Sequence, residues 1–110
     1  AVVWHPGIGE EGFTVVGIGR AGIRSVLNHH VTIQNNTCDQ NGYWGILTGF
    51  SDDLLIQNNT CTRSVNEHGI YVSNSCDRPV IRGNHSHDNR ANGIHMNGDA
   101  VLGGGDGLIE

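Results

Sequence analysis

The sequence predicts an all-β solenoid in which short strands return to the same place about every 23 residues. Three observations support this prediction. The hexapeptide IQNNTC occurs at residues 33–38 and again at 56–61. Gly-Ile pairs recur every 23 or 24 residues, at positions 22–23, 45–46, 69–70 and 93–94, which indicates a repeat architecture. The composition, with 17 Gly among 110 residues and few strong helix formers, argues against an all-helical fold.

Within each repeat the apolar residues alternate over short runs, as in Ile70 and Val72 or Ile94 and Met96, which is the two-residue period of a strand. Equivalent residues of successive circuits are then expected to stack about 4.8 Å apart. Two such columns are predicted to point inward: Ile33, Ile56 and Ile81 as core, and Asn36, Asn59 and Asn84 as a ladder of paired amides. A buried amide needs such partners, because leaving it unmet costs about 1 to 3 kcal/mol.

The three segments VTIQNNTCDQNGYWGIL, LLIQNNTCTRSVNEHGIYVSN and PVIRGNHSHDNRANGIHMNGD resemble the right-handed parallel β-helix repeat of the pectate-lyase-like superfamily. The resemblance covers about residues 22–100 and implies a right-handed parallel β-helix of about 4 to 5 rungs. This fold carries lyases, epimerases, hydrolases, tailspikes and adhesins, so the resemblance alone does not assign an activity.

We expect residues 1–110 to form a single domain with three parts. Residues 1–21 are an atypical N-terminal rung with Phe13 and Val15 pointing inward, 22–100 are regular rungs, and 101–110 start a further rung in which Ile109 enters the core. Neither end shows a capping helix. The expectation is therefore a fragment of a longer solenoid, or a protein whose uncapped ends stack on another copy.

Alternation also predicts which side chains leave the core. If the isoleucines of the Gly-Ile pairs point inward, Arg24, Tyr71 and His95 point outward in one column, and Trp44 and His68 precede the glycines in the next. Asn97 and Asp99 follow in the last repeat. One face of one sheet is therefore predicted to gather the candidate site residues Arg24, Trp44, His68, Tyr71, His95, Asn97 and Asp99.

The residue types on this face suit a sugar acid. An aromatic ring stacks on a pyranose, Arg24 pairs with a carboxylate, and proton removal beside that carboxylate can use His68 or Tyr71 as base and His95 as acid. Enzymes with similar folds that act as polyuronate lyases or epimerases use these residue types. Three alternatives stay open: a noncatalytic glycan-binding face, a plain solvated face, and a structural solenoid that stacks end to end into a fibre.

The charge and hydropathy of the sequence restrict the classes of partner that it can bind. The net charge of −5 without a Lys/Arg cluster argues against nucleic acid or an anionic membrane surface, and no apolar run approaches the ~20 residues of a membrane span. A polysaccharide, or a second copy of the chain, is the expected partner. We expect the protein to be secreted or displayed on a bacterial cell surface.

No cofactor or metal site is assigned with certainty. Calcium is an option, because Asp52-Asp53 and Asp99 with Asp106 supply hard oxygen ligands. His85 and His87 in NHSHDN are expected in a surface turn, where they could chelate a metal but lack a clear third ligand.

The three cysteines are too few for a disulfide framework. Cys38 and Cys61 are expected to be reduced and buried in the inward column that Ser86 continues, with Cys76 the more exposed thiol, in a turn.

Overall fold

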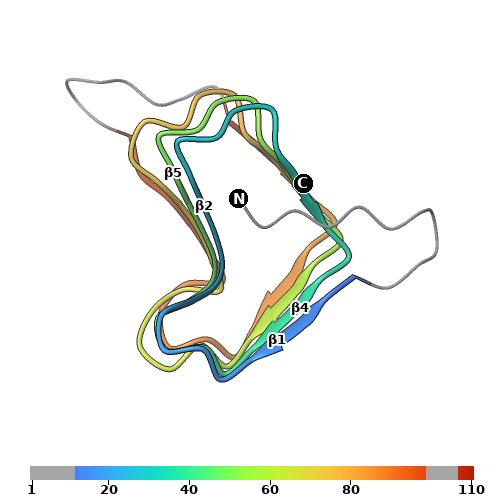
Figure 1. The fold of residues 1–110 in the computed structure, drawn as a ribbon, viewed down its shortest axis with the longest axis vertical. Coiled ribbons are helices and arrows are strands. Elements are labelled where there is room, and N and C mark those ends of the chain that lie inside the picture. Colours follow the sequence, from blue (N-terminus) through green and yellow to red (C-terminus); the bar gives the residue numbers. More distant parts are fainter. Residues whose placement is uncertain (1–11, 99–106) are drawn as a thin grey trace.

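The chain winds into a solenoid of three parallel four-stranded sheets in the computed structural model, which describes residues 12–98 and 107–110. Each circuit passes through sheets A, B and C in turn, and the next circuit lies against it (Figure 1). The predicted all-β, right-handed parallel β-helix is confirmed, with about four circuits.

Sheet A contains β1 (Thr14–Val16), β4 (Thr37–Asp39), β7 (Thr60–Thr62) and β10 (His85–His87). Sheet B contains β2 (Ala21–Val26), β5 (Trp44–Gly49), β8 (Ile70–Ser73) and β11 (Ile94–Met96). Sheet C contains β3 (Thr32–Gln34), β6 (Leu55–Gln57), β9 (Val80–Arg82) and β12 (Leu108–Ile109).

Stacked aliphatic side chains fill the interior. Ile33 pairs with Ile56, and Ile56 with Ile81, in sheet C, while Ile23, Ile46, Ile70 and Ile94 stack in sheet B. The first three of the sheet B column and all three of sheet C are at most 1% exposed. Burying one such side chain stabilises the fold by roughly 1.5 to 3 kcal/mol. These two columns of isoleucines form the main part of the core, which also contains Cys38, Leu54, Cys61, Val72 and Cys76.

The two asparagines of the repeated hexapeptide have different tasks. Asn35 and Asn58 turn the chain from sheet C to sheet A with φ angles of 61° and 56°, and Gly83 takes the same position at 64°. Asn and Gly are the residues that adopt this left-handed conformation most readily. The second asparagines form the predicted ladder, in which Asn36 Nδ2 donates to Asn59 Oδ1 at 3.1 Å and Asn59 Nδ2 to Asn84 Oδ1 at 3.0 Å.

The glycine of each Gly-Ile pair recurs because two circuits approach closely there. A Cβ atom on Gly22 would lie 2.9 Å from the Gly45 carbonyl oxygen, one on Gly45 2.7 Å from that of Gly69, and one on Gly69 2.8 Å from that of Gly93. Any side chain at these positions would push neighbouring circuits apart. The Gly-Ile signature therefore combines a close backbone contact with a core side chain.

The ends of the stack keep the predicted register but are less buried than predicted. Val15 pairs with Cys38, and Ile109 pairs with Ile81. Phe13 and Ile109, both predicted to point inward, are 47% and 52% exposed, because within the described residues no further circuit packs against them. Residues 1–11 and 99–106 lie outside the described part of the chain, and so do portions of the expected atypical rung (1–21) and further rung (101–110).

The inward cysteine column is present, since Cys38 pairs with Cys61, and Cys61 with Ser86. Both thiols are free and 0% exposed. The neighbouring Cys38 thiol and burial together raise the pKa of Cys61 well above its usual value.

The prediction that Cys76 is the more exposed thiol is wrong. Its side chain is 2% exposed and its thiol donates to the Ser73 carbonyl oxygen at 3.1 Å, because the turn after β8 folds back over the core; burial raises its pKa as well.

Replacing the central rung of the amide ladder tests this account of the repeat. Asn59→Ala removes the acceptor of the Asn36 main-chain N–H and the donor to the Ile33 carbonyl, at a site that is 1% exposed. We expect a loss of about 1 to 3 kcal/mol in the free energy of unfolding, measured by urea denaturation. Asn74→Ala, at an exposed turn position, is the matched control and should change stability by less than about 0.5 kcal/mol. Equal effects of both substitutions would contradict the ladder.

Candidate functional site

The outward side of sheet B assembles most of the predicted site. The pairing of β2, β5, β8 and β11 places Arg24, Leu47, Tyr71 and His95 in one column. Trp44 and His68 lie next to this column. Their rings form an aromatic cluster, defined as Trp44, His68, Tyr71 and His95, with centroid distances of 6.0 Å for Trp44–Tyr71, 5.2 Å for His68–Tyr71 and 4.5 Å for the stacked pair His68–His95.

A chain of hydrogen bonds crosses the cluster. The Asn92 amide nitrogen lies 3.1 Å from His95 Nδ1, His95 Nε2 lies 2.9 Å from Asn97 Oδ1, and Asn97 Nδ2 donates to the Tyr71 hydroxyl oxygen at 2.6 Å. An amide nitrogen can only donate, so His95 Nδ1 accepts and its Nε2–H donates. The Asn97 amide therefore couples His95 to Tyr71.

His68 is held as a neutral imidazole. Its Nδ1 accepts the Asn92 main-chain N–H at 3.0 Å, so its proton resides on Nε2, which lies 3.5 Å from Glu67 Oε2. The side chain is 12% exposed. Burial, and second the neighbouring His95, lower the pKa of His68, and Glu67 opposes them. The two histidines differ in environment although their rings are parallel within 5°.

The other predicted residues are placed differently. Arg24 is exposed and forms no ion pair with the described residues, but Leu47 separates it from Tyr71, which puts the two main chains about 9.6 Å apart. Asp99 lies outside the described part of the chain.

Sequence reasoning missed Arg20, whose guanidinium lies over the rings of Tyr43 and Trp44 at 5.0 and 5.6 Å from their centroids. Arg20 precedes β2 in a corner, where strand alternation gives no signal. Asn92 precedes Gly93 as Trp44 and His68 precede their glycines, but it was not included in the predicted site, although it donates hydrogen bonds to both histidines.

Comparison with known proteins agrees with this architecture. A family model described as the right handed beta helix region matches residues 11–104. The chain belongs to the right-handed β-helix family. No curated protein and no solved structure matches this β-helix at a significant level. Within its described residues, no helix is long and apolar enough to cross a membrane.

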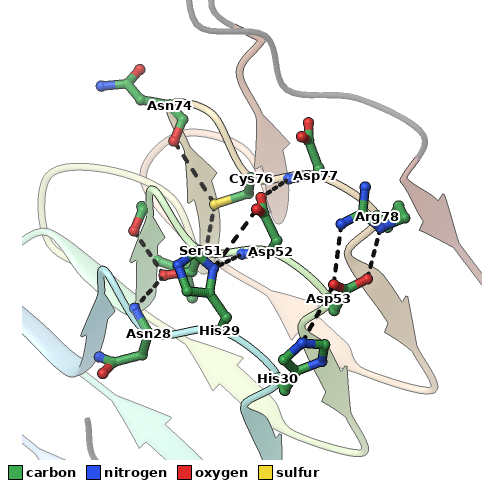
Figure 2. Close-up of polar contacts among 12 residues, drawn as sticks. Asn28, His29, His30, Ser51, Asp52, Asp53, Asn74, Cys76, Asp77 and Arg78 are labelled. Atoms are coloured by element: carbon green, nitrogen blue, oxygen red, sulfur yellow. Dashed lines mark hydrogen bonds and ion pairs between the residues drawn. The ribbon is translucent and has the colours of Figure 1, made fainter.

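The acidic pair considered for calcium lies at the corner of the β-helix between sheets B and C, and its carboxylates already have protein partners (Figure 2). Arg78 binds both Asp53 oxygens at 2.7 and 3.1 Å, and this hydrogen bonding is the main reason that the pKa of Asp53 is lowered. Asp52 Oδ1 accepts the Asp77 main-chain N–H at 2.9 Å. Among residues 12–98 and 107–110, no group of three or more His, Cys, Asp or Glu could hold a metal ion, and Asp99 and Asp106 lie outside them.

The histidines outside sheet B also have defined positions. His29 and His30 approach different carboxylates, those of Asp52 at 3.7 Å and Asp53 at 3.8 Å. The predicted surface turn at NHSHDN is wrong, because His85–His87 is strand β10. It pairs with β7 in the register that places His85 beside Thr60.

The lowered pKa of His68 predicts a pH dependence of stability. The unfolded chain takes up a proton at this residue near pH 6.5, whereas the folded β-helix does so only at lower pH. The unfolded state binds more protons in that interval, so the contribution of His68 is fully present above about pH 6.5 and is lost as the pH falls toward the folded pKa.

NMR titration of the His68 ring should give a midpoint below about 6.5, and His95→Gln should raise it, because His95 contributes to the shift. Melting temperatures between about pH 7.5 and 5.5 should depend less on pH in His68→Gln than in His30→Gln, whose side chain is 79% exposed in the wild type. A His68 midpoint above 6.5 would refute the described environment.

Proposed function

We propose that the outward face of sheet B binds an acidic polysaccharide and that Tyr71 removes a proton from it beside a carboxylate. The observation that carries the proposal is the Tyr71 hydroxyl, positioned by Asn97 inside a partly exposed aromatic cluster. The reaction class is that of a polyuronate lyase or a uronate epimerase, and binding without turnover is the coarser version of the same function.

Binding is supported by three features of the face. The Trp44 and Tyr71 rings are partly exposed and lie 6.0 Å apart, a surface on which sugar rings can stack. Arg24 extends from the same face and has no carboxylate partner within the described residues, so it can pair with a uronate. Trp44 Nε1 is buried without a hydrogen-bond partner there, and a ligand oxygen that reached it would satisfy it.

The geometry favours Tyr71 over His68 as the base. His68 Nδ1 already accepts a main-chain N–H, and Nε2 carries the proton, so His68 has no lone pair to offer. The Tyr71 oxygen accepts from Asn97 Nδ2, a donor that stabilises negative charge on that oxygen once its proton has left. His95, expected as an acid, directs its Nε2–H at Asn97, so we assign it the positioning of Asn97 and Tyr71.

The proposed chemistry balances without a cofactor. Tyr71 acts as the phenolate, after its own proton has passed to solvent. The proton on the carbon next to the carboxylate moves to the phenolate oxygen, and the carbanion is stabilised by the carboxylate paired with Arg24. In the lyase version the bond between the adjacent carbon and the glycosidic oxygen breaks, a C=C bond forms, and the Tyr71 hydroxyl gives its proton to the departing oxygen. In the epimerase version water donates a proton to the opposite face of the same carbon, and the Tyr71 hydroxyl returns its proton to solvent. Because such polymers lie outside cells, the proposal includes secretion or display on a bacterial cell surface.

Turnover and binding are tested together on alginate, pectate and glycosaminoglycans. Ultraviolet absorbance detects the unsaturated lyase product, NMR detects epimerised sugars, and calorimetry measures binding. We expect Tyr71→Phe to lower turnover by about 10²- to 10⁴-fold with binding retained. Trp44→Ala and Arg24→Gln should each weaken binding by about tenfold.

The matched control is Arg82→Gln, an exposed arginine on sheet C that should change neither property. Wild-type protein that neither binds nor converts any of these polymers would exclude the function. Full turnover by Tyr71→Phe would exclude the role of Tyr71 alone.

End-to-end stacking into a fibre is the second candidate, and exposed apolar residues favour it. Phe13, Val16 and Ile18 of the first described circuit are 47 to 51% exposed, and Leu108 and Ile109 of the last are 45% and 52% exposed. A second copy that continued the strand pairing would cover Phe13, Ile18 and Ile109, together with the strand edges that have no partner among the described residues.

Light scattering over a range of protein concentrations tests the stacking. We expect the mass to rise with concentration, and Ile18→Lys or Ile109→Lys to prevent the rise by placing a charge in the contact. Val65→Lys is the control, because Val65 is 58% exposed but lies in a corner of an inner circuit. A monomer at every concentration would contradict stacking and leave the sheet B proposal untouched.

A further inference from the structure

We propose that His85 and His87 chelate a divalent transition-metal ion, such as Cu²⁺, Ni²⁺ or Zn²⁺, on the outward face of sheet A. The two residues are two positions apart on β10, so their side chains leave the same face of the strand. Their rings lie face to face, with a centroid distance of 4.2 Å and an interplanar angle of 25°. Two imidazoles held side by side in this way can direct one nitrogen each at a shared ion.

Asp88 fixes the His87 ring in the tautomer that can bind a metal ion. The carboxylate oxygen Oδ2 of Asp88 lies 2.7 Å from His87 Nδ1, and an ionised carboxylate can only accept, so Nδ1 carries the proton. The lone pair of His87 is therefore on Nε2. A carboxylate that accepts from the far nitrogen of a metal-binding histidine fixes the tautomer and increases the basicity of the ligand. The His87 side chain is 39% exposed, so an ion can reach it from solvent.

His85 is available to complete the pair. It is exposed, and within the described residues its ring contacts His87 and forms no hydrogen bond or ion pair. Its neighbours below in the same column are Thr60 and Thr37, whose small side chains leave room around the imidazole. The column of His87 holds Thr62 and Asp39 below it. The inner circuits have Thr or Asp at these two positions, so the stacking of the circuits does not require histidine at either of them.

The other close pair of histidines lacks this availability. His68 and His95 are also stacked, at 4.5 Å, but each has Nδ1 occupied as an acceptor, and His95 Nε2 donates to Asn97. Since no described group offers three preformed protein ligands, water molecules must fill the remaining positions around an ion at His85 and His87. We therefore expect an exchangeable site whose affinity follows the general order, with Cu²⁺ bound more tightly than Ni²⁺ or Zn²⁺. The site is independent of polysaccharide binding.

Calorimetric titration of the full chain with CuCl₂, NiCl₂ or ZnCl₂, each alone, tests the proposal. We expect one ion per chain, and a loss of tenfold or more in affinity in His85→Gln and in His87→Gln. Asp88→Asn should lose about tenfold in affinity while keeping both imidazoles. The matched control is the double variant His29→Gln/His30→Gln, whose histidines are adjacent and approach separate carboxylates, and its affinity should equal that of the wild type.

NMR of the wild-type chain gives a second readout that needs no substitution. Cu²⁺ should broaden the ring signals of His85 and His87 before those of the other histidines. The proposal is overturned if the wild type binds none of the three ions at millimolar concentration. It is equally overturned if the double variant His85→Gln/His87→Gln, shown to be folded by circular dichroism, retains wild-type affinity.

Discussion

Parallel main-chain pairing between successive circuits is the constraint on which the rest of the structure depends. Strands such as β3, β6 and β9 pair at equivalent positions, so that each residue of a strand has a fixed partner in the next circuit. An inward residue is then favoured when it matches the residues above and below it, as the isoleucines of sheet C match one another and the amides of the ladder match one another. Asn59 satisfies this rule completely, since it is bonded to Asn36 on one side and Asn84 on the other. The sequence repeats because equivalent residues of successive circuits stack on one another.

The same constraint separates structural from functional positions. Stacking constrains the residue types of the inward columns, whereas the residue types of the outward columns vary from circuit to circuit. The series Arg24, Leu47, Tyr71 and His95 illustrates this variation. Residues distant in sequence therefore meet on a sheet face without any turn designed to bring them together. Strand alternation and the repeat were together enough to predict a β-solenoid, its main inward columns and the grouping of Trp44, His68, Tyr71, His95 and Asn97, because strand period and repeat register determine a position on the surface. The right-handed parallel β-helix was implied by the family resemblance.

The features that sequence reasoning missed lie in corners or occur once. Asn41 accepts the Ile18 main-chain N–H and donates to the Val15 carbonyl oxygen, and Asn89 makes the same two contacts with Ser64 and Cys61. Ser64 occupies the equivalent position in the circuit between them, so the asparagine recurs only in alternate circuits and gives a weak sequence signal. Arg20 and Asn92 act from the same corner, and Cys76 is buried by the turn that contains it. Corner geometry depends on left-handed residues such as Gln40, Phe50 and Arg63, which are not the usual choice for that conformation and give no sequence signal.

The corners differ in how much length they allow. Between sheets C and A the chain turns over residues 35–36, 58–59 and 83–84, whereas between sheets A and B it uses 17–20, 40–43, 63–69 and 88–93, and Figure 1 shows the third of these loops projecting farther than its neighbours. The strands on either side keep their pairing despite this difference. The A–B corner borders the aromatic cluster. Insertions in this corner can therefore change which ligand the β-helix recognises without changing the packing of its core. For an engineer, this corner is the natural point at which to graft a new loop.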